Sequence, residues 1–230
     1  MVSIAIGRLA NDSRIVGFVA TTNATAIKRK SPAARRLEIL QAASEIALTE
    51  GLEAVSNRRI AEHLDCAAGL IHHYFPVAMD LLSEALRQVL MTDHGASFGE
   101  AAEQPDALAG LSTLLTRWSF HEADQYALLW LDAWSLARRQ PQIRAVVDEV
   151  MKEGHLELTA LIRRGIDEGR FITKDASAVA WYLLTTLDGI TVHTSIGVNQ
   201  NLVDIQRTVA IFTEQELGLA PGSLRIGGGS

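Results

Sequence analysis

The stretch SNRRIAEHLDCAAGLIHHYFP, residues 56–76, decides the fold. Its spacing is typical of two short helices joined by a tight turn, with the small residue Ala61 where the helices cross. Asp65 follows four residues later, at the turn, and aspartate is among the residues that tolerate the left-handed conformation. Cys66 and Ile71 supply the buried positions after the turn. The pattern predicts a helix-turn-helix.

The second helix of this motif has the dimensions of a DNA-reading element. A helix over residues 68–74 is roughly 10 Å long, and the major groove of B-DNA is about 12 Å wide. We expect His72 and His73 to face the bases, and Ser56 and Arg58 to bind phosphates. The alternative is that the two histidines are merely solvent-exposed on a short helix.

Helical spacing extends through most of the remaining chain. Ser31 followed by Pro32 predicts the start of a helix that ends at Gly51, and Asp175 is a predicted cap near the end of the chain. We count about nine helices and find no convincing strand, so the fold class is all-α. The predicted domains are a flexible arm (1–27), a three-helix DNA-binding domain (28–77), a larger ligand-binding and dimerisation domain (78–219) and a flexible tail (220–230).

Composition indicates a soluble globular protein. The uneven charge distribution favours binding of a polyanion by its front half. The chain has 230 residues and is 48% hydrophobic, enough to bury a core. Residues 1–95 carry 10 basic and 10 acidic side chains, whereas residues 96–230 carry 11 and 17. One cysteine, Cys66, excludes an internal disulfide framework. The apolar stretch Ile15–Ile27 is too short to span a membrane, and we expect a cytoplasmic protein.

The run GLIHHYFP, residues 69–76, with the helical residues before and after it, resembles the DNA-binding domain of TetR-family transcriptional regulators. The resemblance covers about residues 32–90. The rear half is more loosely similar to the ligand-binding half of regulators of the choline-responsive BetI type. That similarity is carried by Trp130, Trp134, Arg138–Pro141, Gly165, Gly169–Phe171 and Asp188–Gly189.

The resemblance implies a ligand-responsive regulator, typically a repressor, that binds a palindromic operator as a homodimer. The last two helices, about 175–197 and 201–217, would form a four-helix bundle with their mates. A small effector among the central helices would change the separation of the recognition helices, which a palindrome requires to be roughly 34–36 Å apart. The implied partners are double-stranded DNA, an effector and a second copy of the chain.

Positions that usually face DNA in that family define the candidate DNA-binding residues. They are Ser56, Arg58, Ala68, Gly69, His72, His73 and Tyr74. Ala68 stands where lysine is common, Val77–Ala78 replace a usual Ser-Lys, and Asp65 replaces the turn glycine, so fewer phosphate contacts are expected. We expect Lys28, Arg29 and Lys30, with Arg35 and Arg36, to restore them.

Large aromatic residues in the acidic half predict a small-molecule pocket. The candidate residues for the wall of this pocket are Trp118, Trp130, Trp134 and Trp181. The alternative is that they belong to the hydrophobic core, as aromatic residues at helical spacing more often do. Asp132 and Asp188 would favour a cationic effector if they are buried near a tryptophan; if they are exposed, they carry no information. Met151 and His155 complete the set of ligand-binding candidates.

No chemistry other than binding is predicted. His63, His121, His155 and His193 show no metal-ligand spacing, and the chain has no P-loop, dinucleotide turn or nucleophile elbow. We therefore expect no metal, no cofactor and no enzymatic activity. Two alternatives remain open, namely a helical small-molecule enzyme and an architectural or partner-binding helical protein without an effector.

Overall fold

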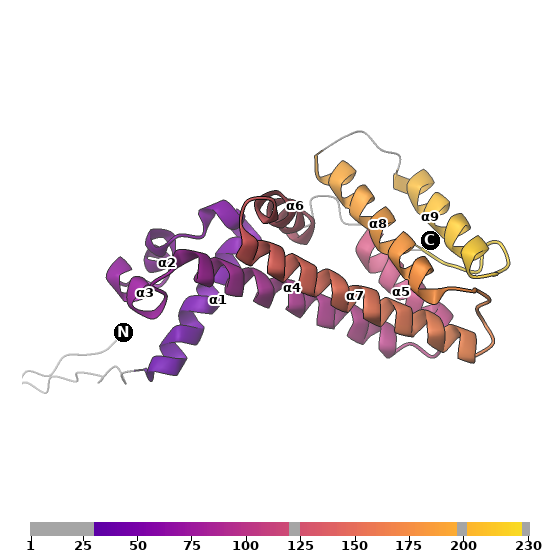
Figure 1. Ribbon diagram of the computed structural model, residues 1–230, viewed down its shortest axis with the longest axis horizontal. Helices are drawn as coiled ribbons and strands as arrows, with labels where there is room; N and C mark the ends of the chain where they lie inside the picture. Colours follow the sequence, from indigo (N-terminus) through magenta and orange to yellow (C-terminus); the bar gives the residue numbers. More distant parts are fainter. Residues whose placement is uncertain (1–29, 120–124, 197–201, 227–230) are drawn as a thin grey trace, which may run out of the picture. The chain divides into compact units, whose positions relative to one another are not determined.

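The computed structural model describes residues 30–119, 125–196 and 202–226, and within these ranges it contains α-helices, one short 3₁₀ helix and no strand (Figure 1). The predicted arm (1–27), Lys28, Arg29 and His121 lie outside the described residues. The elements are α1 (Pro32–Glu50), η1 (Leu52–Ala54), α2 (Asn57–His63), α3 (Ala68–Tyr74), α4 (Ala78–Ala102), α5 (Ala107–Ser119), α6 (Gln125–Ala137), α7 (Pro141–Asp167), α8 (Ala176–Ser195) and α9 (Leu202–Glu216). The all-α prediction is confirmed.

Helices α2 and α8 each begin with a side-chain cap, and the sequence predicted the one at Asp175. The Ser56 hydroxyl oxygen accepts a hydrogen bond from the Arg59 backbone N–H at 3.2 Å and starts α2. The Asp175 carboxylate accepts one from the Ala178 backbone N–H at 3.0 Å and starts α8. Each cap satisfies a backbone donor that the first helical turn leaves without a partner.

The turns of the helix-turn-helix also follow from the sequence. Gly51, directly after α1, has φ 91°, and Asp65, between α2 and α3, has φ 48°. The Asp65 turn lets the Cys66 backbone N–H donate to the Ala61 carbonyl at 3.0 Å, which closes the end of α2. Left-handed backbone at a non-glycine residue is uncommon outside aspartate and asparagine, so the residue type fits its position.

The front helices share one hydrophobic cluster. Ile39 of α1, Ile60 of α2, Ile71 of α3 and Leu81 of α4 are each no more than 1% exposed within it. Phe75, at the end of α3, is also buried there. Helix α3 is therefore held to the other helices through its inner face.

An arginine on α1 stabilises this cluster from the protein surface. The Arg36 guanidinium donates from Nη2 to both carboxylate oxygens of Glu84 on α4, at 2.6 and 2.8 Å. The same guanidinium lies 4.4 Å from the centre of the Phe75 ring, within the range of a cation–π contact. Arg36 thus ties α1, α4 and the end of α3 together.

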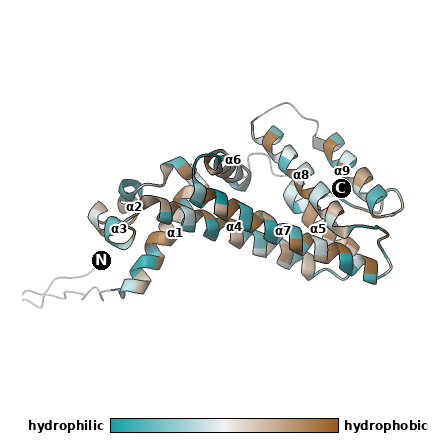
Figure 2. Cartoon of the chain, viewed as in Figure 1, coloured by the Kyte–Doolittle hydropathy of each residue, from teal (hydrophilic) through white to brown (hydrophobic). Residues whose placement is uncertain are grey.

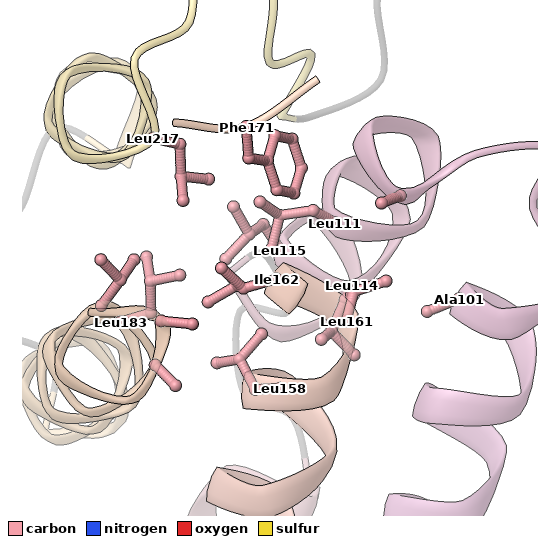
Figure 3. Close-up of a cluster of buried hydrophobic side chains, with 14 of the residues drawn as sticks. Ala101, Leu111, Leu114, Leu115, Leu158, Leu161, Ile162, Phe171, Leu183 and Leu217 are labelled. Carbon is pink, nitrogen blue, oxygen red and sulfur yellow. The ribbon is translucent and has the colours of Figure 1, made fainter. Parts of the chain in front are cut away.

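The rear helices enclose two further clusters. One joins α1, η1, α4, α6 and α7, and the other joins α4, α5, α7, α8 and the residues after α9 (Figure 3). Long α4 and α7 pack side by side, and both carry hydrophobic and hydrophilic residues along their length (Figures 1 and 2). None of the described helices is long and apolar enough to cross a membrane.

A close contact at the end of α7 explains one residue of the rear-half resemblance. Figure 3 shows Phe171 among the leucines of the cluster, where it is only 2% exposed. A side-chain carbon at Gly165 would lie 2.0 Å from the Phe171 ring. Only glycine leaves room for that ring.

Part of the segment predicted to be a flexible tail, up to residue 226, packs against the rear cluster. Leu224 is buried in the rear cluster. The carboxylate of Glu214, itself only 3% exposed, accepts hydrogen bonds from the backbone N–H groups of Gly222 at 3.0 Å and Leu224 at 2.8 Å. Loop composition indicated the absence of regular structure correctly, but a buried carboxylate that requires donors holds this segment in place.

Candidate functional site

The outer face of α3 is exposed in the part of the chain that the structure describes. Ile71 is fully buried and Phe75 nearly so, whereas the neighbouring His72 and His73 are exposed. Helix geometry causes this division, because residues one and two positions from a buried residue lie on other faces. The two imidazoles therefore point away from the hydrophobic cluster beneath them.

Smaller residues extend the same surface. Ala68 and Gly69, at the start of α3, are exposed, and a side-chain carbon at Gly69 would meet no atom within 4 Å. Tyr74 is half-buried and sets its ring edge-on to His73 at 5.3 Å between centroids. No contact among the described residues requires glycine at position 69.

The start of α2 presents a cation and a hydroxyl. The Arg58 side chain is 88% exposed, with only a 3.2 Å ion pair to Glu62 on its own helix. Arg59, in contrast, donates two hydrogen bonds to Glu50 and holds the pKa of that carboxyl below its ordinary value. The Ser56 oxygen accepts from backbone, which leaves its own proton available to an outside acceptor.

The basic residues before and within α1 differ in the contacts that their side chains make. Lys30 is exposed. Arg35 pairs with Glu38 at 2.8 Å on the same helix, and Arg36 is committed to Glu84 and the Phe75 ring. The structure therefore shows a packing role for Arg36 that sequence patterns did not reveal.

A cavity of about 330 Å³ opens among α4, α5, α6, α7 and α8. Its lining includes Trp118, Trp130 and Trp134, together with Met151 and Asp188. The rings of Trp130 and Trp134, one helical turn apart on α6, lie 5.4 Å apart between centroids. The size and the mostly aromatic and aliphatic lining are those of a small-molecule site.

The negative charge of one carboxyl group in this cavity is not balanced by any described residue. Asp93 is paired with Arg117 at 2.9 Å, so the charges of these two lining residues offset each other. Asp188 makes no hydrogen bond or ion pair with any described residue, and burial raises its pKa to about 6. At neutral pH, Asp188 therefore places a negative charge in an apolar wall.

Three candidate ligand residues do not line the cavity. Asp132 accepts a hydrogen bond from the Leu52 backbone N–H at 3.1 Å and so joins α6 to η1. His155 on α7 stacks on Trp181 of α8 at 4.4 Å, and Trp181 is 40% exposed. The sequence identified these residue types but not the directions in which they point.

The structure also assembles a group that the sequence analysis missed. His94 of α4 lies beside Glu153 and Glu157 of α7, with one ligating atom from each residue within 4.8 Å of the others. The glutamates are four residues apart on one helical face, but the histidine is distant in sequence. No local motif could have indicated this cluster.

Comparison with protein families identifies both halves of the chain. Residues 39–85 match the family of bacterial regulatory proteins of the tetR type, and residues 109–217 match the C-terminal region of BetI-type transcriptional repressors. Together the two matches cover more than half of the chain. This protein belongs to the TetR family of transcriptional regulators. TetR-family proteins are transcriptional regulators rather than enzymes, which removes the enzyme alternative.

Solved structures share the fold of this TetR-family regulator. A proposed transcriptional regulator from Saccharomonospora viridis in complex with choline has 23% identity and a TM-score of 0.69, over 80% of this chain and 98% of that one. A TetR transcription regulator from Haloarcula marismortui has 24% identity and a TM-score of 0.69, over 80% and 99%. A proposed regulator from Pseudomonas aeruginosa has 21% identity and a TM-score of 0.67, over 87% and 99%. No curated protein sequence matches the chain.

Replacement of Asp188 by asparagine should stabilise the protein at neutral pH. The pKa of an exposed aspartate is 3.8, and burial raises the pKa of Asp188 to about 6 in the native state. Between these values the native state holds the additional proton, so this group lowers stability as the pH rises. The free energy of unfolding of Asp188→Asn should exceed that of the wild type by up to about 3 kcal/mol above pH 6.

Urea unfolding of both proteins from pH 4 to 8 measures this difference. It should be near zero at pH 4 and grow as the pH approaches 6. A difference that is constant across this range would contradict an uncompensated carboxylate in the cavity.

Proposed function

We propose that this TetR-family regulator is a cytoplasmic repressor that binds a palindromic operator as a homodimer and is released by a small cationic effector. The observation that carries the proposal is the cavity, in which an unpaired carboxyl lies among three tryptophans. An exposed recognition surface on α3 supplies the DNA-binding half of the proposal.

The DNA contacts are assigned to the exposed face of α2 and α3. His72 and His73 face outward from a buried base, and each imidazole can donate to a base or a phosphate. Arg58 and the Ser56 hydroxyl lie at the start of α2, suited to phosphate oxygens. Lys28, Arg29, Lys30 and Arg35 are proposed to add contacts from the basic segment around the start of α1, while Arg36 is assigned to packing.

The charged side chains that line the cavity favour a cationic effector. Arg117 is already bonded to two carboxylates and to the Ser97 hydroxyl, so an anion would find no free guanidinium there. Asp188 would pair with a cation, and the rings of Trp118, Trp130 and Trp134 would attract it through their faces. A similar fold that holds choline, in the Saccharomonospora viridis protein, supports a quaternary ammonium ion as the first probe.

Helix α6 offers a route from the cavity to the DNA-binding helices. Trp130 and Trp134 face the cavity, whereas Asp132, between them in sequence, bonds to the Leu52 backbone N–H of η1. Leu52 is buried and lies between α1 and α2. We assign Asp132 to this coupling rather than to the ligand, because a shift of α6 would act directly on the segment that precedes α2.

Exposed apolar side chains on the last two helices support a dimer interface. Trp181 on α8 is 40% exposed, and Ile211 and Phe212 on α9 are 41% and 49% exposed. Several large apolar residues left open to water indicate an interaction surface. We propose that a second copy of α8 and α9 covers them.

A gel shift with the DNA upstream of the protein's own gene tests this function. The full chain should give a specific complex that contains two copies of the protein. Choline should release the DNA at lower concentration than 3,3-dimethylbutan-1-ol, its uncharged isostere, because only choline can pair with Asp188.

Asp188→Asn is the matched variant for this experiment. It should bind the same DNA but show a smaller preference for choline over the neutral compound, because only the cation–π attraction of the tryptophans remains. Specific DNA binding that no quaternary ammonium ion releases would instead favour an effector-free DNA-binding protein. Absence of specific binding would contradict the DNA-binding assignment.

Substitution of Gly69 by alanine separates stability from DNA binding. Glycine within a helix costs up to about 1 kcal/mol relative to alanine, and the added methyl group would meet no protein atom within 4 Å. Gly69→Ala should therefore raise the melting temperature while it weakens operator binding, because the methyl group would stand between α3 and the DNA.

Calorimetric melting and fluorescence anisotropy with labelled operator measure the two effects. Ala67→Gly, at the exposed residue just before α3, is a control for the general effect of glycine near the helix. Unchanged operator affinity in Gly69→Ala would show that DNA does not approach this position.

A further inference from the structure

We propose that His94, Glu153 and Glu157 form a binding site for a divalent transition-metal ion of the zinc type, between α4 and α7. This site is separate from the effector pocket in its ligand atoms, although His94 also lines the cavity wall. It does not depend on the identity of the effector or on DNA binding.

The histidine nitrogen that would hold the ion makes no hydrogen bond. The His94 side chain is only 10% exposed, and its Nε2 atom is buried without a hydrogen bond. Nε2 lies 3.1 Å from a carboxylate oxygen of Glu157, and the ligand atoms of all three residues lie within 4.8 Å of one another. A buried nitrogen without a hydrogen bond is costly, and a metal ion would satisfy it.

Packing against neighbouring residues fixes the orientation of the His94 imidazole. Its ring packs on Phe98 at 4.7 Å between centroids, and Phe98 packs edge-on against Trp118 at 5.3 Å. On α7, a side-chain carbon at Gly154 would lie 3.6 Å from the imidazole, an ordinary van der Waals distance, so the ring lies directly beside this part of α7. A ligand whose orientation is fixed in advance loses little entropy when it binds an ion.

The charges around the cluster favour a cation. Two carboxylates four residues apart on one helix repel each other, and among the described residues no lysine or arginine pairs with Glu153 or Glu157. The nearby basic side chains are engaged elsewhere, as Lys152 binds Asp148 and Arg87 binds Glu149. A simple ion pair with protonated His94 would offset only one of the two negative charges.

The ligand set selects the class of metal. One imidazole nitrogen and two carboxylate oxygens are suitable for zinc, which takes three protein ligands and leaves a fourth position for water. Magnesium prefers an all-oxygen octahedron and binds imidazole poorly. Because the ligands come from two helices, the ion would cross-link α4 to α7 beside the cavity.

Titration of the full chain with ZnCl₂ tests the site, after treatment with EDTA and removal of the chelator. Calorimetry should show a saturable site of micromolar or tighter affinity, and the melting temperature should rise because only the folded state assembles the ligands. Magnesium at the same concentration should give no rise.

Variants decide whether these residues bind the zinc. Glu157→Gln, at a side chain 44% exposed, should fold normally and weaken zinc binding at least about tenfold, since even outer-shell substitutions commonly cost that much. Glu153→Gln should do the same, and His94→Gln should abolish the site. If His94→Gln does not fold, the two glutamine variants carry the test.

Control variants remove a histidine or a glutamate elsewhere. His63→Gln breaks another histidine–glutamate pair, with Glu45 at 3.3 Å, and Glu149→Gln removes a different carboxylate of α7. Both should bind zinc as the wild type does. The proposal is overturned if the wild type shows no saturable binding, if Glu157→Gln binds zinc equally well, or if His63→Gln loses the site.

Discussion

The rest of the structure depends on the packing of helix α4. Leu81 at its start is buried with the helix-turn-helix, Leu86 and Leu90 belong to the second cluster, and Ala101 at its end belongs to the rear cluster. One uninterrupted helix of 25 residues thus takes part in all three hydrophobic clusters. Because packed interiors resist deformation, a displacement of α4 at the cavity cannot stay local, and it reaches the elements that hold α3.

The structure combines an exposed helix face on α3 with a costly interior charge at Asp188. Burial of Ile71 and Phe75 fixes α3 so that two small residues, Ala68 and Gly69, and two histidines, His72 and His73, are exposed. In the cavity, Asp188 carries a charge that no described residue compensates, so the free protein is destabilised where a cation would stabilise it. Helix α6 joins these features, since its tryptophans line the cavity and Asp132 reaches the Leu52 backbone.

Local signals made the helix-turn-helix predictable, and long-range packing decided the rest. Ser56, Asp65 and Asp175 act on backbone within a few residues, so their roles follow from sequence. The side on which a tryptophan points depends on distant helices, which is why Trp130 lines the cavity but Trp181 does not. The Asp132 contact, the His94 cluster and the buried Glu214 beneath the tail each join segments far apart in the chain, and no motif encodes such proximity.

The most direct test of the central claim, that the outer face of α3 reads duplex DNA, is a comparison of affinities for the upstream DNA and for an unrelated duplex of equal length. Wild-type protein and a His72→Ala/His73→Ala double variant would be compared at the same salt concentration, because nonspecific binding depends strongly on salt. The account predicts that the double variant, folded and unchanged in melting temperature, loses the preference for the upstream DNA. An unchanged preference would contradict it.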